Sequence, residues 1–212
     1  MTDIAIVDYG MGNLRSVAKA LEHVAPEAVI AVTNNPEVVR KAERVVVPGQ
    51  GAMPDCLHEL DRHGLREAVR DAAANKPFLG ICIGLQMLFD NTEEGNVSGL
   101  GIVPGRVKRF PASAMKDEKG QKLKVPHMGW NQVHQAMEHF LWKNIANDSR
   151  FYFVHSYYVE TADANSAGYS AYPFPFTCAV AKDNIFAVQF HPEKSHAAGL
   201  TLLHNFVQWK PV

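Results

Sequence analysis

The first half of the chain alternates short apolar runs with helix-like segments, and this alternation limits the folds available to it. DIAIVDYG (3–10), ERVVVPG (43–49) and PFLGIC (77–82) are rich in Val and Ile and end at or near Gly or Cys. LRSVAKALEHV (14–24) and LREAVRDAAANK (65–76) repeat apolar residues at close to helical spacing. Strands that are apolar on both faces and alternate with helices indicate a parallel sheet covered on both sides. The sequence therefore predicts an α/β fold.

The second half of the chain has a different pattern. Strand-like segments, joined mostly by short turns, follow in the order IVPGRVKRF, KLKVP, WNQVH, FYFVHSYYVE, AGYSAY, TCAVAK and IFAVQF. We expect them to extend the mostly parallel central sheet in a more antiparallel manner, and AAGLTLLHNFVQW (197–209) to form a closing helix. The polar stretch 113–124 is typical of an exposed loop. No segment resembles a linker, so a single domain is predicted over residues 1–212.

Charge and hydropathy argue against several functional classes. Lys and Arg number 21 and Asp and Glu number 22, and no basic stretch carries interleaved aromatic residues, so neither nucleic acid nor an anionic membrane is an expected partner. The apolar stretch 77–89 is shorter than the roughly 18 residues of a membrane span, and the N-terminus lacks the basic flank of a secretion signal. We therefore expect a cytoplasmic protein.

The cysteines predict neither a disulfide framework nor a metal site. Cys56, Cys82 and Cys178 are odd in number, have unrelated spacings and form no C-x-x-C pair. Any cysteine with a special role here must owe it to its reactivity.

Cys82 stands between Gly80 and Gly84, where an apolar run ends and a helical pattern begins. A residue at a sharp strand-to-helix turn is strained, and neighbours without a Cβ relieve the crowding, as in the G-x-S-x-G nucleophile elbow. Such a turn would expose the thiol, and a helix starting near Ile83 would favour the thiolate. The alternative is a buried core cysteine, the usual environment of a free thiol.

A nucleophile needs a base, and HPE at 191–193 can supply one. His191 follows the strand-like IFAVQF, and Pro192 favours extended backbone before it. Because residues i and i+2 of an extended segment project to the same side, Glu193 can lie beside the imidazole and orient it. The carboxyl ends of neighbouring parallel strands meet at one edge, so Cys82, His191 and Glu193 form a plausible triad.

Attack on a carbonyl also requires donors for the negative oxygen. The backbone N–H of Ile83 is one expected donor, and the loop that contains Gly49, Gln50 and Gly51 is the expected source of the other. Without a reactive cysteine nearby, PGQG would be an ordinary turn.

Six segments together resemble the class I, triad-type glutamine amidotransferases. They are VDYGMGNLRS (7–16), PGQGA (48–52), GICIGLQMLF (80–89), PHMGWN (126–131), FVHSYY (153–158) and VQFHPEKS (188–195). PHMGWN, FVHSYY and the single-domain length are most similar to the glutaminase subunits of imidazole glycerol phosphate synthase. The resemblance covers essentially the whole chain and implies a flavodoxin-like sheet flanked by helices.

The resemblance implies that Cys82 is the nucleophile, His191 the proton shuttle and Glu193 its orienting carboxylate. The amide of L-glutamine would be attacked by sulfur, ammonia would leave, and water would cleave the glutamyl thioester. Contacts with glutamine or its oxyanion are implied for Gly49, Gln50, Gly51, Ile83, Gln86, Glu94, His155, Ser156 and Tyr157. Without the resemblance, Gln86 and Glu94 are more typical of solvated helix residues.

The resemblance also implies a partner, because ammonia released into water near neutral pH becomes ammonium, which is not a nucleophile. The implied partner is the cyclase subunit of imidazole glycerol phosphate synthase, a (β/α)8 barrel, in a heterodimer. Asn13, which is also expected to cap the first helix, Tyr152 and Lys194 occupy positions at or near this contact. For Lys194 the alternative is a solvated surface charge. No metal or organic cofactor is implied.

Two features of the motifs lead to further expectations. Many relatives carry adjacent glycines where this chain has Gly49 and Gln50, and the larger side chain restricts the backbone. We hypothesise that this loop completes the oxyanion site only when the partner is engaged.

His127 and Trp130 have catalytic residue types but are interpreted as a structural loop that supports the active-site wall.

Two other functions fit parts of the pattern. A glutaminase subunit of anthranilate or aminodeoxychorismate synthesis would have the same triad and a different partner. A cysteine-based stress or binding protein of similar fold typically has the elbow cysteine without a terminal His-Pro-Glu, so VQFHPEKS argues against it.

Overall fold

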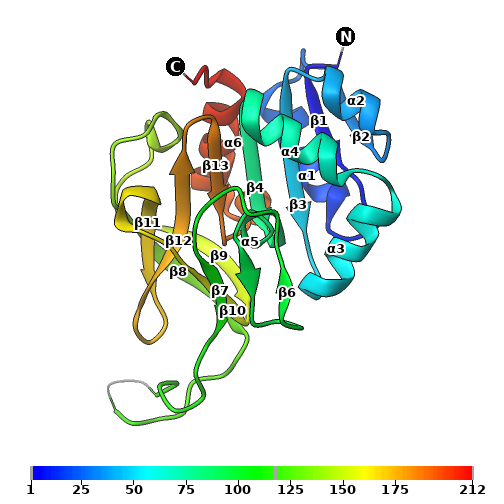
Figure 1. Ribbon diagram of the computed structural model, residues 1–212. Coiled ribbons are helices and arrows are strands. Elements are labelled where there is room, and N and C mark those ends of the chain that lie inside the picture. The colour runs from blue at the N-terminus through cyan, green and yellow to red at the C-terminus, as the bar shows by residue number, and fades with distance from the viewer. Residues whose placement is uncertain (1, 117–118, 212) are drawn as a thin grey trace.

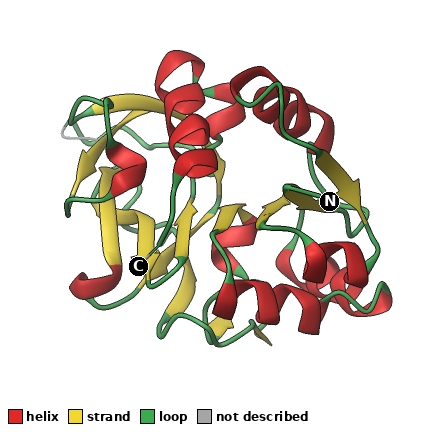
Figure 2. Cartoon of the chain, turned by 90° about the horizontal axis from the view of Figure 1, so that it is seen from above, coloured by secondary structure: helices red, strands yellow, loops and turns green. Residues whose placement is uncertain are grey.

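The computed structural model describes residues 2–116 and 119–211, and it contains a mixed sheet with helices on both faces (Figures 1 and 2). The strand order is β2-β1-β3-β4-β13-β12-β10-β7-β5-β6, with β11 paired to β12 and β8, and β9 paired to β8. The predicted α/β class, with a parallel centre and an antiparallel extension, is confirmed.

The parallel half of the sheet runs from β2 to β13, and each strand pairs in parallel with its neighbour. The strands are β1 (Ile4–Val7), β2 (Ile30–Thr33), β3 (Arg44–Gly49), β4 (Phe78–Cys82) and β13 (Ile185–Val188). All but the edge strand β2 are buried along nearly their whole length, as strands covered on both faces must be. Their carboxyl ends therefore emerge at one edge, where β4 passes into α5 (Ile83–Gln86).

The longer helices cover the parallel half. They are α1 (Leu14–Val24), α2 (Pro36–Lys41), α3 (Met53–Arg62), α4 (Arg66–Asn75) and α6 (His196–Gln208). α1 packs with α6, and α2 packs with α4. Asn13 is at the N-cap position of α1, as predicted, but its side chain makes no capping hydrogen bond. α3 was not predicted.

The mostly antiparallel half, in which β5 pairs in parallel with β7, joins the parallel half through the pairing of β12 with β13. Its strands are β5 (Asn91–Thr92), β6 (Val97–Ser98), β7 (Arg106–Arg109), β8 (His127–Gln135), β9 (Ser149–His155), β10 (Tyr157–Glu160), β11 (Ser166–Ala171) and β12 (Pro175–Lys182). Short 3-10 turns lie at η1 (Phe140–Trp142), η2 (Asp163–Asn165) and η3 (Pro192–Lys194).

Two predictions for the antiparallel half were wrong. KLKVP (122–126) forms no strand beyond an isolated bridge between Lys116 and Lys122, and it belongs to the long connection between β7 and β8. Residues 117 and 118 of the predicted loop lie outside the described residues. PHMGWN, expected as a loop, leads directly into β8, whose first residue is His127.

The turn from β4 into α5 lies so close to its neighbours that two glycines are required. A Cβ on Gly84 would collide with the carbonyl oxygen of Val47 in β3. A Cβ on Gly80 would lie 2.7 Å from the Gly84 carbonyl oxygen and 3.0 Å from the Cβ of Ala187 in β13. Crowding against both neighbouring strands therefore explains the G-x-C-x-G spacing.

Gly84→Ala is expected to lower the free energy of unfolding by about 3 kcal/mol, because the new methyl group must displace the backbone of a core strand. Urea unfolding at pH 7 measures the loss. Gly120→Ala is the control, since its Cβ would meet nothing within 4 Å and only its positive φ of 77° opposes the change. The control should lose about 1 kcal/mol. Equal losses in the two variants would contradict the close approach.

Candidate active site

Cys82 occupies the sharp turn between β4 and α5. Its backbone has φ 55° and ψ −105°, which a residue with a Cβ adopts only when its surroundings impose it. The side chain is 5% exposed and lines a cavity of about 230 Å³, so the sulfur can be reached from that cavity. α5 is a single turn of 4 residues, and its dipole is therefore weaker than that of the helix expected from the sequence.

His191 lies just beyond β13, the strand next to β4, and so stands at the same sheet edge as Cys82. Its Nδ1 is 2.8 Å from Oε1 of Glu193, and both side chains are buried. The two residues meet because η3 folds the carboxylate back onto the ring, and not because the segment is extended as the sequence suggested. A carboxylate only accepts, so Nδ1 carries a proton and Nε2 is left to exchange one.

The electrostatics of the site favour a charged imidazole. Burial lowers the pKa of His191, but the interactions with Cys82 and Glu193 together outweigh it and raise that pKa well above its ordinary value. Nε2 is buried and has no hydrogen-bond partner among the described residues. The ring is thus fixed through Nδ1, while Nε2 remains free for proton transfer.

Gln189 is a site residue that the sequence analysis did not identify. Its side-chain nitrogen donates to Sγ of Cys82 over 3.6 Å, and its Oε1 accepts from Nε2 of Gln86 at 3.0 Å. Gln189 directly follows β13 and stands two residues before His191, and its place at this strand end was the available signal. Oε1 of Gln86 is buried with no partner in the described part of the chain, so it can accept a hydrogen bond from a ligand.

His155, Ser156 and Tyr157 form a wall of the cavity between β9 and β10. Nδ1 of His155 donates to the Tyr157 carbonyl at 2.7 Å, and its Nε2 accepts from Nδ1 of His127 at 2.9 Å. Burial lowers the pKa of His155 to about 3 and that of His127 to about 4, so both rings are neutral at pH 7. Because both ring nitrogens of His155 are engaged, the backbone of this residue is the part available to form hydrogen bonds with a ligand.

His127 and Trp130 have different environments. His127 is stacked between Phe153, with ring centroids 5.0 Å apart, and Tyr172, at 4.0 Å, and it accepts from Nδ2 of Asn131 at 3.3 Å. This agrees with its interpretation as support for the active-site wall. Trp130 is 44% exposed on β8, so the same interpretation is wrong for that residue.

The other predicted residues approach the cavity from the loops after β3 and β5. Gly49 pairs with Cys82 at the end of the β3–β4 ladder. Glu94 follows β5 and is not on a helix; its Oε2 accepts from the backbone N–H of Met53 at the start of α3. The predicted residues that line this cavity are Gln50, Gly51, Cys82, Ile83, Gln86, Glu94, His155, Ser156, Tyr157 and His191.

An exposed aromatic surface lies next to the triad, and we define it as Met128, Trp130, Tyr152, Lys194 and His196. Met128 is 62% exposed. The Trp130 ring lies 6.1 Å from that of Tyr152 and 4.9 Å from that of His196. Nζ of Lys194 is 5.9 Å from the Tyr152 ring. The structure therefore brings together Tyr152 and Lys194, two of the residues predicted for a partner interface.

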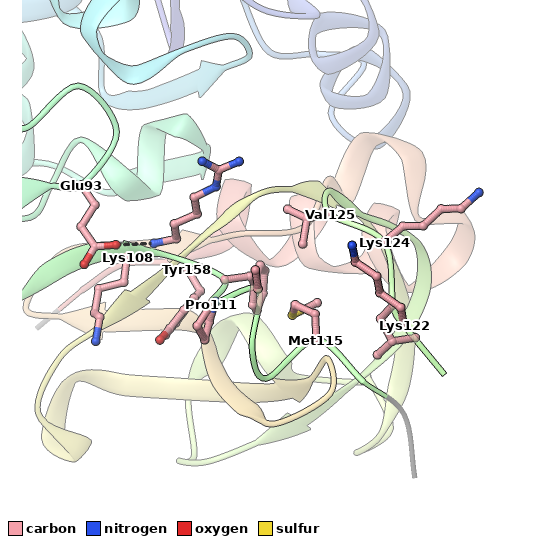
Figure 3. Close-up of a pocket in the computed structure, with 12 residues that line it drawn as sticks. Glu93, Lys108, Pro111, Met115, Lys122, Lys124, Val125 and Tyr158 are labelled. Atoms are coloured by element: carbon pink, nitrogen blue, oxygen red, sulfur yellow. Dashed lines mark hydrogen bonds between the residues drawn. The ribbon is translucent and has the colours of Figure 1, made fainter. Parts of the chain in front are cut away.

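A larger cavity, of about 960 Å³, lies elsewhere and is shown in Figure 3. Its lining combines apolar side chains with Lys108, Lys122 and Lys124, and Glu93 accepts there from the backbone N–H of Arg109 at 2.9 Å. Among the described residues, no thiol or imidazole lines it, so these residues do not include the pair found in the smaller cavity.

Residues 2–116 and 119–211 contain no group of three or more His, Cys, Asp or Glu side chains arranged to hold a metal ion. Across the same ranges, none of the helices is both long enough and apolar enough to cross a membrane. The three cysteines are free and buried.

Comparison with known proteins defines the class. Residues 5–209 match the family model of the class-I glutamine amidotransferases. Among solved structures, a glutamine amidotransferase has a TM-score of 0.71 at 15% identity, over 97% of this chain and 99% of that one. PurLQS from Thermotoga maritima has a TM-score of 0.69 at 17% identity, over 98% and 99%. These two likenesses show the fold, and the family model shows a class-I glutamine amidotransferase.

Relatives of higher identity narrow the family. The chain is 93% identical over 212 residues to imidazole glycerol phosphate synthase subunit HisH of Nitrosospira multiformis, with 100% of both chains covered. It is 65% identical to subunit HisH of Nitrosomonas europaea, again over 100% of both. The chain belongs to the family of HisH subunits of imidazole glycerol phosphate synthase.

Glu193→Gln is expected to lower the pKa of His191, because a neutral amide replaces the carboxylate that favours the imidazolium. A folded-state pKa raised above the unfolded value stabilises the fold fully below about pH 6.5, and this contribution is lost as the pH rises through the folded-state pKa. We expect the variant to lose about 3 kcal/mol of unfolding free energy at pH 6 and less under alkaline conditions, as measured by urea titration.

The matched control for this measurement is Glu37→Gln, which removes a surface ion pair with Arg40 (2.7 Å). It should leave the free energy of unfolding nearly unchanged at either pH, because solvent screens an exposed ion pair. A loss for Glu193→Gln that does not depend on pH would rule out the charged pair.

Proposed function

We propose that this chain hydrolyses the side-chain amide of L-glutamine through Cys82, as the glutaminase subunit of imidazole glycerol phosphate synthase. The observation that carries the proposal is the meeting of thiol, imidazole and carboxylate at one sheet edge beside a small cavity. Glu193 orients His191, and His191 stands beside the strained turn that presents Cys82.

The reaction follows from this arrangement. With the thiol proton held on His191, whose charged form the site favours, the sulfur attacks the amide carbon, whose oxygen becomes negative. Collapse of the tetrahedral intermediate breaks the C–N bond, and ammonia leaves with the proton from His191, which leaves a γ-glutamyl thioester on Cys82. His191 then removes a proton from water, which attacks the thioester, and glutamate leaves as the sulfur regains that proton. Glu193 remains charged throughout and holds the ring.

The N–H of Ile83 would stabilise the negative oxygen, but its surroundings indicate that it is already engaged. In the β3–β4 ladder the N–H of Val45 donates to the Pro77 carbonyl, and the pairing alternates without a break as far as Gly49. In such a parallel ladder, every second residue of β3 bonds to the two residues that flank its partner in β4. The partner of Gly49 is Cys82, so this pattern directs the Gly49 carbonyl at the N–H of Ile83. The peptide that follows Gly49 must therefore turn before the oxyanion site opens, which supports the hypothesis that this loop completes the site on partner binding.

Polar groups around the cavity can hold the rest of the glutamine. The unpartnered Oε1 of Gln86 and the carboxylate of Glu94 suit an α-ammonium group. The backbone at His155, Ser156 and Tyr157 can bind the opposite side of the substrate, since the His155 ring is engaged with His127.

The aromatic surface is the proposed contact with the (β/α)8-barrel cyclase of a cytoplasmic heterodimer. Exposed aromatic and Met side chains beside a cation are typical of protein interfaces. Asn13 precedes α1, which packs beside η3 and so belongs to the same region as Lys194. Docking here would cover the exit for ammonia, which must reach its acceptor before water protonates it.

Release of glutamate and ammonia by the full-length chain, with and without the cyclase and its ligand, tests the proposed function. We expect equimolar products, a rise in rate on adding the cyclase, and a loss of at least about 10³-fold for Cys82→Ala, since no thioester can then form. Cys178→Ala, which removes a buried thiol in β12, is the matched control and should keep its activity. No release from the parent complex, or release that survives Cys82→Ala, would contradict the proposal.

Lys194→Glu is expected to uncouple glutamine hydrolysis from product formation by the cyclase. Reversing a charge at an interface weakens the association of the two subunits and disturbs their alignment. The ratio of glutamate formed to cyclase product formed should rise about fivefold or more, as measured by parallel assays of both products. Lys143→Glu is the control, since Lys143 makes a similar contact with an aromatic ring, 5.7 Å from Phe140, away from the aromatic surface. An unchanged ratio for Lys194→Glu would remove its interface role.

A further inference from the structure

Two buried side chains outside the triad hold the loop that follows β3. Tyr9, just beyond β1, donates from its hydroxyl to the carbonyl of Pro48 at 2.8 Å. Cys56, on α3, donates from Sγ to the carbonyl of Gln50 at 3.6 Å. Both side chains have no exposed surface. The first bond holds the Pro48–Gly49 peptide, and the second holds the Gln50–Gly51 peptide. The Gly49–Gln50 peptide lies between these two held peptides.

Both groups are in the form that donates. Burial raises the pKa of Tyr9 well above its ordinary value and raises that of Cys56 to about 12. At neutral pH the phenol and the thiol therefore keep their protons. A carbonyl oxygen can only accept, so the direction of each hydrogen bond is fixed.

The packing around the loop leaves little freedom to its anchored parts. A Cβ on Gly49 would collide with the Tyr9 hydroxyl and lie 2.6 Å from the Cβ of Ile83. Gly51 has φ 116°, and a Cβ there would lie 2.7 Å from Cε of Met11. Between these points, glycine at position 49 gives the next peptide the backbone freedom to turn.

We propose that Tyr9 and Cys56 are positioning residues that confine any turning of the loop to the peptide between Gly49 and Gln50. The carbonyls of Pro48 and Gln50 stay fixed while the Gly49–Gln50 peptide rotates. This rotation moves the Gly49 carbonyl away from the Ile83 N–H and points the Gln50 N–H to the side that the carbonyl has left. Neither Tyr9 nor Cys56 lines the cavity, so they act through the backbone and not on the substrate. The inference rests on the proposed glutaminase function and extends it to the placement of the second oxyanion donor.

Tyr9→Phe in the complete complex tests the inference, because it removes the hydroxyl and keeps the ring. Without that anchor the Gln50 N–H, the proposed second oxyanion donor, is poorly placed. The kcat for glutamate release should therefore fall about tenfold while KM stays within about twofold. The rate at which iodoacetamide alkylates Cys82 should be unchanged, since that displacement forms no oxyanion. Cys56→Ala tests the other anchor and should lower kcat about threefold, with the same unchanged alkylation.

Tyr169→Phe and Cys178→Ala are the matched controls. The first removes a hydroxyl that bonds Asp163 at 3.1 Å, and the second removes a buried thiol in β12, so both should keep the parent kcat. The inference is overturned if kcat of both Tyr9→Phe and Cys56→Ala stays within twofold of the parent, or if kcat and alkylation fall together. An inactive parent complex would instead reject the proposed function, so the two failures are distinguishable.

Discussion

The contact between the Cys82 turn and the backbone of β3 is the constraint on which the site depends. Gly84 lies against the Val47 carbonyl with no room for a methyl group, so α5 must begin directly beside β3. That approach imposes the positive φ of Cys82 and turns its sulfur out of the sheet toward the cavity. The pairing of Gly49 with Cys82 lies at the same point of the β3–β4 ladder. The strain at Cys82 and the proposed engagement of the Ile83 N–H therefore share one cause.

The shared sheet edge of Cys82 and His191 could be predicted from the sequence, because that position needs little knowledge of strand order. Parallel strands place their carboxyl ends at one edge, so Cys82 and His191 meet there once both are recognised as strand ends. Gln189 is different, because its bond to Cys82 requires β13 to lie next to β4. The pairing of His127 with His155 likewise depends on β8 lying opposite β9. Such contacts are set by tertiary pairing, which the local pattern does not specify.

α3 and Trp130 show two further limits of prediction from the sequence alone. The buried residues of α3, Met53, Cys56, Leu57 and Leu60, do recur at helical spacing. The helix was missed because the preceding PGQG and Pro54 are also typical of a loop, although proline is favoured in a first helical turn. Trp130 is interpreted from the sequence as part of a supporting loop, whereas it lies on β8 and is exposed. A contiguous exposed apolar patch is typical of a surface that contacts a second molecule, and one sequence does not contain that molecule.

Tyr152 connects the aromatic surface to the triad through its backbone. Its carbonyl accepts from the His191 N–H at 2.9 Å, and its own N–H donates to Oγ of Ser195 at 3.0 Å. The Ser195 hydroxyl in turn donates to the His191 carbonyl at 2.6 Å, which closes the turn that carries Glu193. A partner that packs on Tyr152 would therefore act on the strand that holds His191. The loop at 49–51, by contrast, is anchored from β1 and α3. The proposed contact at Tyr152 and the anchors of the loop thus lie on different elements, so a partner at the aromatic surface would act on the peptide between Gly49 and Gln50 only by binding one of its orientations more tightly.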